Sequence, residues 1–251
     1  QLQAKASTFQ AQLSLYGKVK SQTSELGDAA ALLAGASGWN VQKASTSNSA
    51  AVGVSVGASA VAAALTVEVQ QLARAQSTAS SVVAAGMGTG ASGSLNIELG
   101  SRNDPVPPVP PTFTGTSNVS VAVVATDTVA DIAKKINAAG AGVTATVLRD
   151  GTNERLVIRS SSTGTEAGFR LVPDAGLSSL NFTNPPDSTD DPDQPPPVFV
   201  GQTAQDAEVK INGVDVKSAT NKMVDAVEGV TLQLSQAMTG PVEITIENDL
   251  D

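Results

Sequence analysis

The sequence predicts an α+β protein that is mainly β, with one β-rich domain inserted into another and an α-helical, coiled-coil-like segment at the N-terminus. Three observations support this prediction. Large apolar residues near the N-terminus recur at helical spacing. From about residue 39 the pattern changes to the two-residue alternation that is typical of strands. Glycine-rich and proline-rich loops, and one short helical stretch, then interrupt that alternation.

Residues 1–20 have the spacing of an amphipathic helix. The candidate helix-packing residues follow one another at steps of 4, 3, 4 and 3: Leu2, Ala6, Phe9, Leu13 and Tyr16. These steps keep the side chains on one face at the period of a coiled coil. Because an isolated helix of this length is marginal in water, the stripe needs a partner. That partner is a local core, the missing part of the protein or another subunit.

A second, shorter helix is predicted over Thr23–Ala34, with Gly35 as its C-terminal cap. Period-two strands follow in residues 41–47, 51–58 and 64–73. In the third, Leu65, Val67 and Val69 alternate with polar residues, so one side of the strand is expected to be buried and the other solvated.

A glycine loop at residues 86–93 leads into a predicted strand at 94–99. Residues 101–118 are predicted to be a proline-rich loop, because proline cannot pair in the interior of a sheet. A strand resumes at residues 118–125.

A helix is predicted over Thr126–Ala139, capped by Thr126 or Thr128, with Asp127 and Asp131 in its first turns and Lys134 and Lys135 in its second half. Its predicted buried face consists of Val129, Ile132, Ala133 and Ile136.

A hairpin at residues 142–160 is expected to turn at Asp150–Asn153, and a strand is expected near Phe169–Val172. Residues 173–198 form an acidic loop. Four short strands are predicted after it: 207–213, 214–217, 230–235 and 241–248. Asn212-Gly213 is a tight-turn signal between the first two.

This order predicts a nested arrangement of domains. A partial helical segment covers residues 1–38, and one β-rich domain combines residues 39–92 with 199–251. Residues 93–198 form the inserted β-rich domain with one helix. The glycine loop and the proline- and aspartate-rich loop are the expected crossings, since insertion keeps both ends of a domain close together.

The composition excludes several kinds of chemistry. The 251 residues include no Cys and no His, which removes disulfides, thiol nucleophiles and imidazole bases. The net charge is −9, distributed as +2 in residues 1–92, −5 in 93–198 and −6 in 199–251. An acidic chain lacks the basic face that nucleic acid requires. We therefore predict no nucleic-acid partner, no membrane insertion, no metal and no cofactor.

Two motif matches and one acidic loop give no support for chemistry on inspection. Gly88–Gly93 matches the dinucleotide pattern GxGxxG, but a strand pattern follows where that site needs a helix. Gly53–Gly57 matches GxSxG, yet Ser55 lies within an alternating strand and has no histidine partner. The acidic loop residues Asp187, Asp190, Asp191 and Asp193 lack the spacing of a calcium loop, and we interpret them as solvated.

Three segments together resemble one family. Residues 65–80 contain the phrase LTVEVQQLARAQSTAS, residues 126–164 resemble a repeat shared with some flagellins, and residues 204–234 contain Ile211-Asn212-Gly213 and Gly229-Val230-Thr231-Leu232. In this order they resemble the bacterial flagellar filament cap proteins, the hook-associated protein 2 family. Because the chain starts at Gln1, we expect a fragment with an upper leg helix and two head domains.

The resemblance implies a secreted structural protein at the filament tip that promotes folding and insertion of exported flagellin and prevents its loss. It implies no enzymatic activity. The implied partners are further copies of itself in a closed ring, flagellin, hook–filament junction proteins, an export chaperone and, for some members, host mucin. Two alternatives stay open at this point: a flagellin-like or adhesive surface filament protein, and a secreted carbohydrate-active enzyme.

Overall fold

The computed structural model describes residues 2–34, 42–103, 109–185, 201–238 and 240–249. In the first helix, the side chains of residues 9–31 are described. Trp39, Gly35 and the aspartates of the acidic loop lie outside the described residues, so the predictions that concern them stay predictions.

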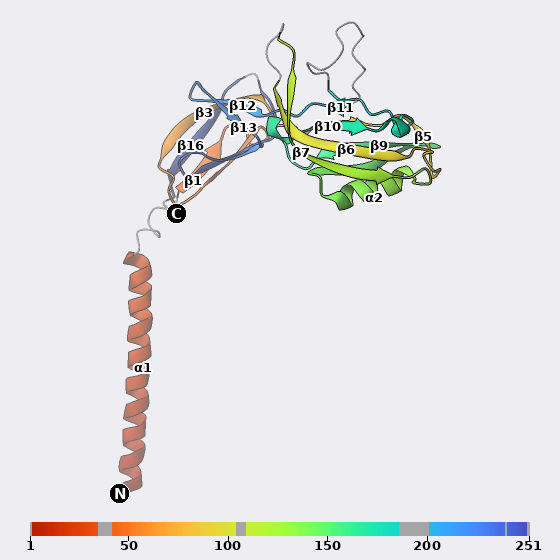
Figure 1. Ribbon diagram of the computed structural model, residues 1–251. Helices are drawn as coiled ribbons and strands as arrows, with labels where there is room; N and C mark the ends of the chain where they lie inside the picture. The colour runs from red at the N-terminus through yellow and green to blue at the C-terminus, as the bar shows by residue number, and fades with distance from the viewer. Residues whose placement is uncertain (1, 35–41, 104–108, 186–200, 239, 250–251) are drawn as a thin grey trace.

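The N-terminal part of the chain is one continuous helix, α1 (Leu2–Ala34), where the sequence analysis predicted two. The prediction treated Thr23 as the start of a new helix, but its hydroxyl donates to the Val19 carbonyl oxygen at 2.8 Å inside the same helix. Gly17 costs only about 1 kcal/mol in a helix interior, too little to end a helix flanked by good helix formers. Figure 1 shows α1 as a separate rod. No helix in the described part of the chain is long and apolar enough to cross a membrane.

The strands nearest α1 in Figure 1 form what we call the proximal unit. Its strands are β1 (Gln42–Thr46), β2 (Val52–Val56), β3 (Ala63–Gln71), β12 (Ala207–Ile211), β13 (Val214–Ser218), β14 (Lys222–Val227), β15 (Val230–Leu234) and β16 (Val242–Asn248). They pair as a five-stranded sheet in the order β1-β16-β3-β12-β13 and a three-stranded sheet in the order β14-β15-β2. All named pairs are antiparallel.

Alternation along the strands explains the proximal core. Leu65, Val67 and Val69 are buried, as the period-two pattern predicted, and they pack with apolar residues of β12, β15 and β16. The hairpin between β12 and β13 turns at Asn212 and Gly213, whose φ angles are 49° and 82°. Two left-handed residues in succession are what a two-residue hairpin turn requires.

The remaining elements form the distal unit. They are β4 (Ser77–Ala79), β5 (Val83–Ala84), β6 (Gly93–Asn103), β7 (Thr112–Val123), α2 (Val129–Ala139), β8 (Val143–Asp150), β9 (Asn153–Ser160), β10 (Gly168–Pro173), β11 (Gly201–Gln202) and two 3₁₀ turns, Thr165–Ala167 and Ala175–Leu177. One sheet has the order β10-β6-β7. The other has the order β11-β4-β9-β5, with β8 also paired to β9. A second hydrophobic core lies between these sheets and α2.

The predicted proline-rich loop at residues 101–118 is wrong in part, because β6 and β7 extend into it as a long hairpin. Arg102 pairs with Phe113, and Asn103 pairs with Thr112. The prolines stand only at residues 105–111, so they do not interrupt the paired residues on either side. The predicted turn of the β8–β9 hairpin is confirmed, with Gly151 at a φ of 60°.

Strand pairing does not follow the predicted crossings between domains. β4 and β5 come before residue 92, yet both pair with β9 of the distal unit. The chain passes between the units at residues 72–76 and 203–206, while the glycine loop lies within the distal unit. Two- and three-residue strands such as β5 and β4 leave almost no alternation to detect, which explains the misplaced crossing. The division into domains stays a prediction, and we move its two boundaries to residues 72–76 and 203–206.

Strand β14 was missed for a related reason. Its pairing with β15 shifts register between Met223 and Val227, and Asp225 there has a φ of 53°. A bulge of this kind adds residues to one strand, so it destroys the two-residue alternation on which strand prediction depends.

Candidate functional site

The predicted packing stripe lies on an unpaired helix. Phe9, Leu13 and Tyr16 are 70%, 74% and 76% exposed, and every described side chain of α1 from residue 9 to 31 is exposed. The side chains of Leu2 and Ala6 lie outside the described residues. All five predicted residues therefore lie in α1, and the three whose side chains are described have no packing partner from the described chain.

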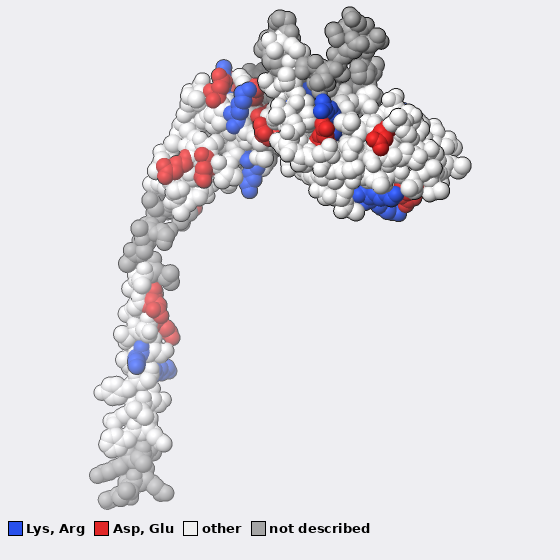
Figure 2. All heavy atoms as spheres, in the orientation of Figure 1, with Lys and Arg blue, Asp and Glu red and all other residues white. Residues whose placement is uncertain are grey.

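The apolar surface of α1 continues beyond these residues. Leu15, Val19 and Leu26 are also exposed, and a shallow hollow lies between Gln12, Leu15, Tyr16 and Val19. Residues 9–17 carry no charge, and Figure 2 shows the corresponding part of the helix free of charged side chains. Burying one large apolar side chain contributes about 1.5–3 kcal/mol, so this surface suits helix–helix packing.

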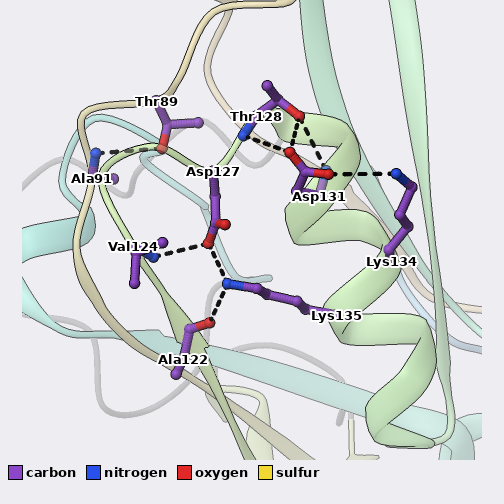
Figure 3. Close-up of polar contacts among 9 residues, drawn as sticks. All are labelled: Thr89, Ala91, Ala122, Val124, Asp127, Thr128, Asp131, Lys134 and Lys135. Carbon is purple, nitrogen blue, oxygen red and sulfur yellow. Dashed lines mark hydrogen bonds and ion pairs between the residues drawn. The ribbon is translucent and has the colours of Figure 1, made fainter.

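Helix α2 begins at Val129, later than the predicted start at Thr126, and Thr128, one of the two predicted capping residues, is its N-cap (Figure 3). The Thr128 hydroxyl accepts a hydrogen bond from the Asp131 N–H, and the Asp131 carboxylate accepts one from the Thr128 N–H, which together make a capping box. The four residues predicted for the buried face, Val129, Ile132, Ala133 and Ile136, are all buried.

Asp127 precedes α2 instead of lying in its first turn, and it has a different role. The Lys135 ammonium lies 2.5 Å from the Asp127 carboxylate and donates to the Ala122 carbonyl oxygen at 3.3 Å. The same carboxylate accepts from the Val124 N–H at 2.9 Å (Figure 3). Ala122 is the next-to-last residue of β7, an edge strand of its sheet, and Val124 directly follows that strand. The pair therefore occupies backbone groups that a foreign strand could otherwise bind.

Removing the ammonium of Lys135 is expected to destabilise the distal unit. In Lys135→Met, the buried Asp127 carboxylate loses its charged partner and the Ala122 oxygen loses a donor, so the free energy of unfolding should fall by about 1–2 kcal/mol. Urea unfolding monitored by circular dichroism measures this change in the free energy of unfolding. The matched control is Lys134→Met, because the Lys134 side chain is 78% exposed and its ammonium lies 3.4 Å from the Asp131 carboxylate. Equal unfolding midpoints for both variants would contradict the assigned role.

The two aspartates also predict how stability responds to acid. The Lys135 ammonium and then the Val124 N–H lower the pKa of Asp127, and hydrogen bonds from Thr128 lower the pKa of Asp131. A carboxyl whose pKa is lower in the folded state stabilises the fold above the unfolded pKa, near 3.8, and loses that contribution as the pH falls through the folded pKa.

We therefore expect the free energy of unfolding to drop between about pH 4 and pH 2, and Asp127→Asn to reduce that drop. Urea titrations at several pH values measure it, with Asp215→Asn, on the exposed hairpin of β12 and β13, as the control. If the free energy of unfolding of Asp127→Asn falls with pH as steeply as that of the unchanged chain, the expectation is wrong.

The catalytic motif matches have structural explanations in this fold. Strand β6, not a helix, begins at Gly93, so the GxGxxG loop does not open a helix that could bind phosphate. Ser55 lies inside β2 and faces Thr231 of β15. Within the described residues, no group of three or more carboxylates is placed to hold a metal ion; the acidic loop lies outside them.

Two family models match the two ends of the chain. The model of the N-terminus of flagellar hook-associated protein 2 matches residues 1–76, and the model of its C-terminus matches residues 204–251. The chain belongs to the flagellar hook-associated protein 2 family. A third model, the flagellin hook IN motif, matches residues 112–162, which contain β7, α2, β8 and β9. The capping box and the Asp127–Lys135 pair lie within the residues that this third model matches.

Solved structures share the fold of this hook-associated protein 2 member. The D2-D3 domains of the flagellar cap protein FliD from Escherichia coli are 23% identical and cover 83% of this chain and 100% of that one, with a TM-score of 0.64. The D1-D2-D3 domains from Escherichia coli are 24% identical, cover 94% and 63%, and have a TM-score of 0.70. The D2-D3 domains from Serratia marcescens are 25% identical, cover 78% and 100%, and have a TM-score of 0.60.

Curated relatives in the hook-associated protein 2 family are longer. The B-type flagellar hook-associated protein 2 of Pseudomonas aeruginosa is 28% identical over 175 residues, which are 63% of this chain and 32% of that protein. The flagellar hook-associated protein 2 of Salmonella typhimurium is 26% identical over 114 residues, or 45% and 23% of the two chains. The chain thus spans about a third or less of the length of these relatives.

Proposed function

We propose that the protein containing this chain caps the distal end of the bacterial flagellar filament, outside the cell. There it promotes folding and insertion of exported flagellin and prevents its loss. The observation that carries the proposal is the match of two models from one family, the N-terminal one at residues 1–76 and the C-terminal one at 204–251. The related FliD structures are described as flagellar cap proteins, which supports the same function.

The proposed partners follow from that function. They are further copies of the protein in a closed ring, flagellin beneath the ring, hook–filament junction proteins and an export chaperone. Contact with host mucin is a further proposal that rests on the family resemblance alone. We propose no nucleic-acid partner, no membrane insertion, no cofactor and no enzymatic activity for a protein whose work is to hold other chains.

We assign the helix-packing role to Leu2, Ala6, Phe9, Leu13 and Tyr16 of α1. The exposure of Phe9, Leu13 and Tyr16 supports it, because large apolar side chains aligned on one helix face are stabilised when a second helix covers them. We propose that this cover comes from helices of the full-length protein or of a neighbouring subunit.

Deleting the gene in the source bacterium tests the proposal. We expect short or missing filaments and flagellin released into the culture medium, both restored by the full-length gene. A deletion strain with filaments of normal length and no released flagellin would overturn the proposal. Immunogold labelling with antibodies to residues 42–249 adds a second measurement. Gold confined to filament tips supports a cap, whereas gold along the whole filament would support the alternative of a flagellin-like or adhesive subunit.

A further inference from the structure

The two β-rich units are joined by a single two-stranded ribbon. β3 pairs with β12 in the proximal unit, and β4 pairs with β11 in the distal unit. Between them Arg74 and Gln205 exchange backbone hydrogen bonds at 2.9 and 3.1 Å, so the same two chain segments stay paired across the junction. Figure 1 shows β12 of the proximal unit and β11 of the distal unit on either side of this junction.

The ribbon is not built as a hinge. Its crossing segments, residues 72–76 and 203–206, contain neither glycine nor proline. Ala73, Ala75 and Ala204 are buried there, so bending the ribbon would expose packed surface. The buried Gln76 amide also bonds both ways with the Phe169 backbone: its nitrogen donates to the Phe169 oxygen, and its oxygen accepts from the Phe169 N–H at 3.1 Å.

A loop of the distal unit, residues 161–167, is hydrogen-bonded to the ribbon. The Asp206 carboxylate accepts hydrogen bonds from the Thr165 N–H at 2.8 Å and from the Thr165 hydroxyl at 3.1 Å. The neighbouring Gly164 N–H donates to the Arg74 oxygen at 3.2 Å. This loop joins β9 to β10, so these bonds tie the distal unit to a residue at the start of the proximal sheet.

A turn of the proximal unit, residues 219–221, contacts both the ribbon and the distal loop. The Asn221 amide bonds both ways with the Ala73 backbone, at 2.7 and 3.0 Å. In the same turn, the Ala219 oxygen accepts from the Thr163 hydroxyl at 2.6 Å. Gly164 lies so close to Ala219 that an added Cβ would come within 2.8 Å of it, and its φ of 97° favours glycine.

Ribbon, distal loop and proximal turn therefore contact one another pairwise, as the sides of a triangle. A single ribbon can twist or bend, but a third contact away from its axis opposes both motions. We infer that this triangle is a lock that holds the two β-rich units at a fixed angle, with Asp206, Asn221 and Thr163 as its positioning residues. The lock goes beyond the capping proposal and does not depend on it.

The test measures the distance between the units in the intact chain. Because the chain has no cysteine of its own, spin labels can be placed at Lys43→Cys on β1 and Lys134→Cys on α2, both exposed. Pulsed electron–electron double resonance between the two spin labels should give one narrow distance distribution in the chain that carries no other substitution. In the double variant Asp206→Ala with Thr163→Ala, which removes three hydrogen bonds of the triangle, we expect the distribution to widen at least about twofold.

The matched control is Asp215→Ala with Thr245→Ala, which changes the same residue types on the proximal sheet away from the junction. It should leave the distribution narrow, and all variants should still melt cooperatively. A broad distribution in the unchanged chain would overturn the lock, and this measurement needs no variant to fold. An unchanged width in the folded double variant would also overturn it, because the triangle would then not set the angle.

Discussion

Replacing Phe9 by aspartate in the full-length protein is expected to abolish normal filament growth. If the α1 stripe packs against another helix, the substitution removes about 2 kcal/mol of apolar burial and adds the larger penalty of burying a charge. Filament length by electron microscopy and swimming on soft agar measure the effect. Thermal melting of the purified protein should also shift downward.

The control for Phe9→Asp is Ser14→Asp. At 100° per residue, Ser14 lies about 140° around α1 from Phe9 and about 100° from Leu15, and its side chain is exposed too. It adds the same charge to the same turns without entering the stripe, so filaments should grow normally. If Phe9→Asp also supports normal filaments and melting, the stripe is not a packing surface.

Truncating Phe169 to alanine is expected to lower the free energy of unfolding of the distal unit by about 3–5 kcal/mol. Phe169 on β10 is 1% exposed and lies in the core between the two distal sheets. Its removal leaves a cavity among branched side chains that cannot fully collapse around it. A loss of this size is a large fraction of the stability of a typical domain.

Urea unfolding with Val172→Ala as the control checks this prediction. Val172 lies on the same strand but is 40% exposed, so its truncation should cost less than about 1 kcal/mol. Comparable losses in the two variants would mean that Phe169 is not central to the core.

Local patterns were sufficient where a few neighbouring residues determine the conformation. Thr128 and Asp131 are three residues apart, so their capping box and the buried face of α2 could be predicted from spacing alone. The turn at Asn212-Gly213 is equally local, because both residues adopt positive φ at little strain. The family resemblance of residues 65–80, 126–164 and 204–234 was also visible without coordinates, and both family matches agree with it.

Features that join distant segments could not be predicted in this way. Nothing near Asp206 indicates that it binds Thr165, 41 residues away, and nothing near Gln76 indicates Phe169, 93 residues away. Three other features also join segments that local patterns do not relate. They are the ribbon shared by two sheets, the edge contact of Lys135 with β7 and the crossing at residues 72–76. Each exists only because the folded chain brings together groups that no local periodicity relates.

The sequence by itself determined the kind of element along most of the chain, the absence of thiol and imidazole chemistry, and the family. The tertiary structure alone decided which strands pair and how the two units are joined. The physical reason is that helix caps, turns and alternation depend on energies within a few residues. Sheet partners and the junction depend on packing and hydrogen bonds between segments whose separation along the chain carries no signal.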